Sequence, residues 1–152
     1  MPVMVESSTL TRVDSFDSPA KSRAEIAQAL GRGMTLNIDN FQELARVDAW
    51  MARNPGCGST IGIRVNPQVG GGRIAAMSTA TDTSKFGIGL EDPGIRAAIL
   101  DAYRQRPWLT AIHAHVGSQG CPLELIGQGI ARTVALAQEI NAAGAQVTTV
   151  DI

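Results

Sequence analysis

Lysine and cysteine are scarce in this sequence, and each scarcity narrows what the protein can be. Only two of the 13 basic residues are lysines, Lys21 and Lys85, so chemistry that needs a lysine amine has two candidates. The two cysteines, Cys57 and Cys121, form no C-x-x-C pair and have no histidine near them at metal-ligand spacing. This usage predicts free thiols in a reducing cytoplasm, with no disulfide framework and no metal site.

Charge of one sign and long apolar runs are also missing. The net charge is −1, so no electrostatic argument favours nucleic acid or an anionic membrane as a partner. No apolar stretch approaches the roughly 20 residues that span a bilayer. The first residues, MPVMVESSTLTRVD, lack the basic start and apolar run of a signal peptide. We therefore expect a soluble, cytoplasmic protein whose 152 residues suit one ordinary domain.

Short apolar runs alternate with helical patterns along the chain. Residues 1–12 show no periodicity and are expected to be an ill-ordered lead-in to a domain over residues 13–152. The patterns predict strands over 13–16, 34–38, 60–65, 109–116 and 147–152, with a long polar loop over 66–89. Helices are predicted after a capping box at Ser22 and Glu25, over 40–53, from Asp92-Pro93 to about 105, and from Pro122 to 144. This order predicts parallel strands joined by right-handed crossovers.

Two architectures fit this order, an open doubly wound sheet and part of a (β/α)8 barrel. Alternation along each strand separates an apolar face from one that turns polar near the carboxyl end. The residues of that polar face are Asn37, Asp39, Arg64, Asn66, His113, His115 and Asp151. Central strands of a doubly wound sheet are apolar on both faces, whereas barrel enzymes place their sites at the carboxyl mouth. We therefore favour an α/β fold, a partial (β/α)8 TIM barrel with about five parallel strands and their helices.

The strongest local signal is LTAIHAHVGSQG, residues 109–120, in which a strand delivers two histidines into a glycine and serine loop. Glycine lets backbone amides approach a ligand, and the Ser118 hydroxyl adds a donor that suits a phosphate. Any one polar residue of this face, taken alone, also fits a mutually hydrogen-bonded cluster in a barrel interior. His113 and His115 together, followed at once by this loop, favour a binding site.

HAHVGSQ, residues 113–119, resembles the motif of the pyridoxal-phosphate decarboxylases that act on diaminopimelate, ornithine and arginine. These enzymes have a barrel related in fold to alanine racemase. Further segments resemble the family in the same order: DSPAKSRAEI (17–26), NIDNFQEL (37–44), IGIRVNPQVG (61–70), SKFGI (84–88) and VTTVDI (147–152). The wording of IRVNP and SKFGI, and the Gln after Gly-Ser, lean toward diaminopimelate decarboxylase and hence lysine biosynthesis.

The resemblance implies pyridoxal phosphate as cofactor, a small amino-acid substrate and a homodimer. It implies that His115 lies flat against the pyridine ring, that Ser118 bonds the phosphate, and that Arg64 holds the polar network around the ring. His113 would support His115. Lys21 and Lys85 match family lysines, although a solvated surface charge explains either one equally well.

Several parts of the family pattern have no counterpart here. The family holds its cofactor as a Schiff base on a lysine in a Tyr-x-x-Lys context, and the one tyrosine, Tyr103, lies in a helix pattern. The glycine-rich loop, the later Glu and Arg, and the C-terminal β-domain have no match. The expectation is a fragment of the barrel domain, inactive alone. The alternatives are a non-catalytic binding or regulatory relative, a gene product without a role, and a pyridoxal-phosphate racemase.

Overall fold

The computed structural model describes residues 15–69, 86–117 and 121–152. Its main sheet runs in the order β1-β2-β3-β5-β6, every neighbouring pair is parallel, and β4 pairs with β3 beside this path. The strands are β1 (Ser15–Phe16), β2 (Thr35–Ile38), β3 (Ile61–Asn66), β4 (Ile88–Gly89), β5 (Leu109–His113) and β6 (Thr149–Asp151).

The sequential strand order decides the architecture. Each crossover moves one strand along in the same direction, and right-handed crossovers then place all the helices on one side of the sheet. A doubly wound sheet needs a reversal of strand order, and the described sheet has none. The fold is therefore a partial α/β barrel with five parallel strands, which confirms the predicted fold class.

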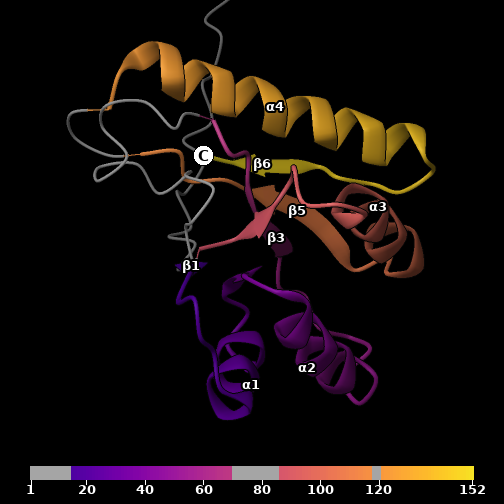
Figure 1. Cartoon of the computed structure of the whole chain (residues 1–152). Coiled ribbons are helices and arrows are strands. Elements are labelled where there is room, and N and C mark those ends of the chain that lie inside the picture. Colours follow the sequence, from indigo (N-terminus) through magenta and orange to yellow (C-terminus); the bar gives the residue numbers. More distant parts are fainter. Residues whose placement is uncertain (1–14, 70–85, 118–120) are drawn as a thin grey trace, which may run out of the picture.

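Four helices cover the outer side of this sheet: α1 (Arg23–Gly31), α2 (Phe41–Met51), α3 (Ile95–Gln105) and α4 (Leu123–Ala142). Figure 1 shows α1 and α2 side by side at the lower end of the curved sheet, next to β2, and α4 at its upper end, next to β5 and β6. The predicted capping box is present, because Ser22 accepts from the Glu25 amide while the Glu25 carboxylate accepts from the Ser22 amide. No helix within the described ranges is long and apolar enough to cross a bilayer.

The hydrophobic core lies between the outer faces of the strands and the helices. Five of its strand side chains are 0% exposed: Leu36, Ile38, Ile61, Ile63 and Ile112. Tyr103 joins α3 to the sheet, since its hydroxyl donates to the Ala111 carbonyl at 2.6 Å and accepts from the Ile63 amide at 3.4 Å. These contacts lie beside a register shift between β3 and β5, where the backbone ladder is irregular. Cys57 and Cys121 are free thiols, as predicted.

Three of the predicted boundaries differ from the structure for specific physical reasons. The strand expected to reach residue 116 ends at His113, because its β6 partner pairs only as far as Asp151 opposite His113. Helix α3 begins at Ile95 rather than at Pro93, because Gly94 has a φ of 77° and is the cap. The loop expected over 66–89 contains β4, which pairs with β3. This strand has only two residues, which is too short to show an alternating pattern in the sequence.

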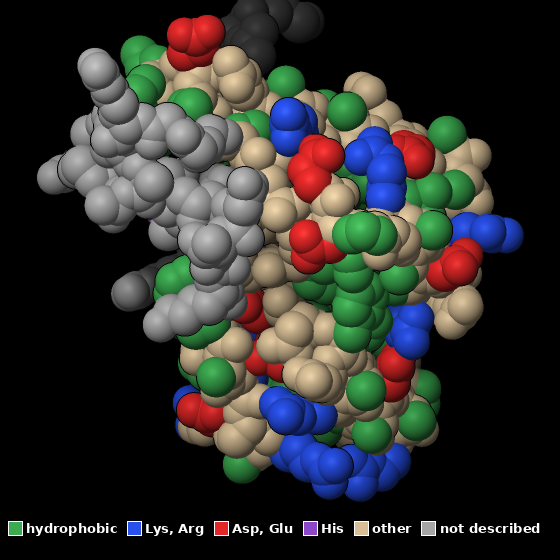
Figure 2. Space-filling model, viewed as in Figure 1, with side chains coloured by type: hydrophobic (Ala, Val, Ile, Leu, Met, Phe, Trp, Pro, Cys, Tyr) green, Lys and Arg blue, Asp and Glu red, His purple; other side chains and the backbone are tan. Residues whose placement is uncertain are grey.

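Helix α4 buries both small and large side chains against the sheet. Its buried residues are Gly129, Thr133, Leu136, Ala137 and Ile140. The apolar residue Val134, on the same helix, is exposed. A Cβ on Gly129 would lie 2.2 Å from a methyl carbon of Val116, so the helix approaches the chain after β5 at the closest distance that glycine allows. Figure 2 shows one face of the molecule, where acidic and basic side chains are interspersed in the upper part and basic side chains gather at the bottom.

Candidate functional site

The carboxyl ends of four adjacent strands bring charged side chains into one layer inside the partial barrel. Asp39 follows β2, Arg64 pairs with His113 across β3 and β5, and His113 pairs with Asp151 across β5 and β6. All four lie on the polar faces of their strands, opposite the core. The convergence expected from the alternation is therefore present, and we call these four residues with Asn37 the polar cup.

Asn37 spans the interior of the polar cup. Its side-chain amide donates to Asp17 Oδ1 at 2.7 Å and to Asp151 Oδ2 at 3.3 Å, and so connects β2 with the distant strand β6. The neighbouring strand carries Gly62 at this level, where a Cβ would lie 2.8 Å from Asn37 Oδ1 and 2.9 Å from the Ala111 carbonyl oxygen. Glycine at this position therefore leaves the space that the Asn37 side chain needs.

Burial shifts the pKa of two groups in the polar cup. It raises the pKa of the Asp39 carboxyl above its ordinary value, while the hydrogen bond from the Gly87 amide and the charge of Arg64 oppose this shift. It lowers the pKa of the His113 imidazole, and the Asp151 carboxylate partly opposes this shift. His113 Nδ1 lies 3.0 Å from Asp151 Oδ2. The polar cup thus favours a neutral imidazole beside a carboxylate.

Arg64, one of the predicted site residues, is held from two sides. Its guanidinium lies 3.6 Å from Asp39 Oδ1 and sits over the Phe86 ring at 5.0 Å from the centroid. Asp39 Oδ2 also accepts from the Gly87 amide at 3.0 Å. Asp39 therefore holds both Arg64 and the segment of Phe86 and Gly87, and it attaches that segment to the carboxyl ends of the strands.

Three buried polar atoms of the polar cup make no hydrogen bond within the described ranges: Asn37 Oδ1, Asp39 Oδ1 and His113 Nδ1. The last two each have a charged neighbour, Arg64 and Asp151 respectively, at the distances given above. Buried polar atoms are normally hydrogen-bonded, and exceptions call for an explanation. A polar ligand in the cup is one such explanation.

The other two predicted site residues lie on the segment after β5. His115 is half-buried and lines a pocket of about 230 Å³ with Gly117, Ile126, Ile130 and other apolar neighbours. Ser118 lies outside the described residues, so its predicted role stays a prediction. On the far side of that gap, Cys121 packs against Gly117, where a Cβ would lie 2.8 Å from its sulfur. Lys85 also lies outside the described residues.

Sequence reasoning missed a buried ion pair behind the polar cup. Lys21 Nζ lies 3.1 Å from Glu43 Oε2, and both side chains are 1% exposed. The equal weight given to a solvated surface charge at Lys21 was wrong, because the residue packs under the first turn of α2. Two signals were available for Lys21, the rarity of lysine and its match to a family lysine, whereas Glu43 resembles an ordinary first-turn acid after the Asn40 cap. No cluster of metal-ligating side chains occurs among the described residues.

A family model described as "pyridoxal-dependent decarboxylase, pyridoxal binding domain" matches residues 10–152. Diaminopimelate decarboxylase of Helicobacter pylori is 28% identical over 144 residues, which cover 90% of this chain and 34% of that protein. The enzyme of the same name from Neisseria meningitidis serogroup A is 32% identical over 143 residues, with the same two coverages. The chain thus spans about a third of the length of the curated relatives it matches.

Solved structures agree with these matches. The crystal structure of the Helicobacter pylori enzyme complexed with L-lysine superposes with a TM-score of 0.70 at 28% identity, covering 86% of this chain and 33% of that one. The arginine decarboxylase of Paramecium bursaria Chlorella virus, bound to agmatine, has a TM-score of 0.66 at 20% identity. It covers 91% of this chain and 34% of the viral one, and at that identity it shows the fold alone.

Proposed function

Because the chain belongs to the pyridoxal-dependent decarboxylase family, matching its pyridoxal-binding domain, we propose that it forms one wall of the cofactor site of an amino-acid decarboxylase. The observation that carries this proposal is the polar layer at the carboxyl ends of β2, β3, β5 and β6. Barrel enzymes build their sites at this end of the strands. The unsatisfied polar atoms of the cup, with its guanidinium and carboxylates, fit a ligand that bears charged and polar substituents.

Each predicted residue has a role in this proposal. His115 offers its imidazole to the face of the pyridine ring, and Ser118 donates its hydroxyl to the phosphate. Arg64 supplies a fixed positive charge to the polar network beside the ring. When bound, pyridoxal phosphate supplies an electron sink for the electron pair left by the departing CO2. The protein residues bind, orient and set the charge around it.

The substrate in this proposal is diaminopimelate or a similar amino acid with a carboxylated α-carbon. Support comes from the relatives above, several of which are named diaminopimelate decarboxylase. The residues that read the far end of the substrate are not identified in this chain. A homodimer and a cytoplasmic location stay predictions from the resemblance and from composition.

One observation favours a second candidate, a chain that binds the cofactor without anchoring it covalently. Lys21 is the only lysine among the described residues, and its amine contacts Glu43 and the Ser18 carbonyl in the interior. An amine that is paired with a carboxylate and buried is a poor nucleophile. We therefore expect no covalent adduct on Lys21.

The test is a titration of the purified chain with pyridoxal phosphate, followed by tryptophan fluorescence and by borohydride reduction with mass spectrometry. Arg64→Gln is expected to weaken binding by about tenfold or more, the effect of losing one charged contact. The matched control is Arg96→Gln, which removes an exposed arginine of α3 that pairs with Glu139. Equal affinity in the Arg64→Gln and wild-type chains would overturn the proposal, and a stoichiometric reduced adduct on Lys21 or Lys85 would overturn the binding-only candidate.

A further inference from the structure

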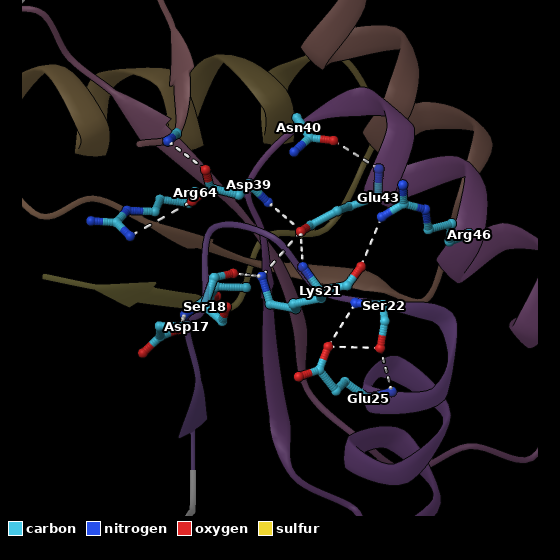
Figure 3. A network of polar contacts seen from close by, with 12 residues as sticks. Asp17, Ser18, Lys21, Ser22, Glu25, Asp39, Asn40, Glu43, Arg46 and Arg64 are labelled. Carbon is cyan, nitrogen blue, oxygen red and sulfur yellow. Dashed lines mark hydrogen bonds and ion pairs between the residues drawn. The ribbon is translucent and has the colours of Figure 1, made fainter. Parts of the chain in front are cut away.

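We propose that Glu43, paired with Lys21, is a positioning residue for Arg64 and acts through Asp39. The ligand in this inference rests on the proposed function, whereas the geometry of the contacts can be measured separately. Figure 3 shows the network, which runs from the loop after β1 through the first turn of α2 to the mouth of the barrel.

The Glu43 carboxylate receives hydrogen bonds from three donors in the interior. Oε1 accepts from the Lys21 backbone amide at 2.8 Å. Oε2 accepts from Lys21 Nζ at 3.1 Å and from the Asp39 backbone amide at 2.9 Å. A buried carboxylate is costly unless paired and hydrogen-bonded, and this arrangement meets both conditions. Glu43 therefore fixes the loop of Lys21 and the end of β2 to one another.

Lys21 is in turn held by groups that leave it little freedom. Its amine also donates to the Ser18 carbonyl, and its own carbonyl accepts from Arg46 at 2.7 Å. Replacing a buried ion pair with apolar side chains is often neutral or stabilising, so the pair is weak evidence of a stability role alone. However, an apolar pair could not accept the hydrogen bond that the Asp39 backbone amide donates to Glu43.

Asp39 transmits this constraint to the mouth of the barrel. Its amide is fixed by Glu43, and its carboxylate contacts the Arg64 guanidinium and the Gly87 amide at the distances given above. The Asp39 and Arg64 side chains are 3% and 11% exposed, so solvent contributes little to holding either side chain in place. A rotation at Asp39 would therefore move Arg64 and release Gly87 together.

The chemistry of Glu43 makes a sharp substitution available. All three of its partners are donors, so the amide nitrogen of Glu43→Gln must face a donor in either orientation. The shape of the side chain stays the same, and the charge and one acceptor are lost. The matched control is Glu25→Gln, because Glu25 also accepts hydrogen bonds in the same loop region, from Ser22, but is exposed and belongs to the first turn of α1.

Two readouts separate positioning from stability. Hydrogen exchange followed by mass spectrometry reports the amides of residues 86–90. Glu43→Gln is expected to speed exchange at Gly87 by about tenfold, as for one lost charged hydrogen bond, and Glu25→Gln to leave it unchanged. The pyridoxal phosphate Kd is expected to rise by a similar factor in Glu43→Gln only.

A double variant guards against simple loss of folding. The double variant Lys21→Met with Glu43→Met removes both charges. Its urea midpoint is expected to return from that of Glu43→Gln to that of the wild-type chain. Its exchange at Gly87 is expected to stay as fast, and its affinity for pyridoxal phosphate as weak, as in Glu43→Gln. Full recovery of both readouts in this double variant, or unchanged exchange in Glu43→Gln, would overturn the inference. If the wild-type chain binds no pyridoxal phosphate, the proposed function fails, and exchange at Gly87 still decides whether Glu43 positions Asp39.

Discussion

Two glycines of α4 provide a matched pair in which the same substitution has opposite expected effects. At Gly127 no heavy atom lies within 4 Å of the place that a Cβ would take, whereas at Gly129 a Cβ would lie 2.2 Å from one Val116 methyl and 3.0 Å from the other. Alanine is favoured over glycine in a helix by about 1 kcal/mol at either site. The difference between the two variants therefore isolates the contact with Val116.

The structure sets the size of that difference. Val116 is 6% exposed and packs with Val69 and Leu125, and its branched side chain has few alternative rotamers. Inserting a methyl into such a contact typically costs about 1–3 kcal/mol. We expect Gly127→Ala to raise the free energy of unfolding by about 0.5–1 kcal/mol. The free energy of unfolding of Gly129→Ala is expected to be about 1–3 kcal/mol lower than that of Gly127→Ala.

The assay is urea unfolding followed by circular dichroism at one protein concentration. A double variant, Val116→Ala with Gly129→Ala, is expected to show favourable coupling, because it removes the two methyls that collide. The reasoning is refuted if Gly129→Ala is as stable as Gly127→Ala. Since Val116 lies between His115 and Gly117, Gly129→Ala is also expected to weaken pyridoxal phosphate binding, and Gly127→Ala to leave it unchanged.

Two further predictions concern Tyr103 and His113. Tyr103→Phe removes the hydroxyl that hydrogen-bonds to the buried Ala111 carbonyl and Ile63 amide. The free energy of unfolding should therefore fall by about 1–3 kcal/mol. A change near zero in urea unfolding would contradict this role. Burial lowers the pKa of His113 from its ordinary 6.5, so the unfolded chain binds the proton more readily. Stability is therefore expected to decline as pH falls from about 6.5 through the folded pKa, and His113→Gln should flatten this decline in urea midpoints measured between about pH 5 and 8. Parallel pH profiles for the two chains would show that His113 does not cause it.

Much of the fold could be predicted because its signals are local. The capping box at Ser22 depends on residues three apart, and the separation of Arg64 from Ile63 onto opposite faces follows from strand alternation alone. The boundaries that failed depend on distant partners or on one residue's backbone conformation. The end of β5 at His113 is set by the length of β6, and the start of α3 by the conformation of Gly94.

By itself, the sequence determined the alternation of strands and helices, the polar faces of the strands, and the motif around His115 that resembles the pyridoxal-phosphate decarboxylases. Only the tertiary structure decided that the strands follow one another in order around a partial barrel, that Asn37 reaches Asp151, and that Lys21 is buried against Glu43. The physical reason is sequence separation. These contacts join residues that are 22 and 114 positions apart, and their geometry depends on strand register and on the space that Gly62 leaves.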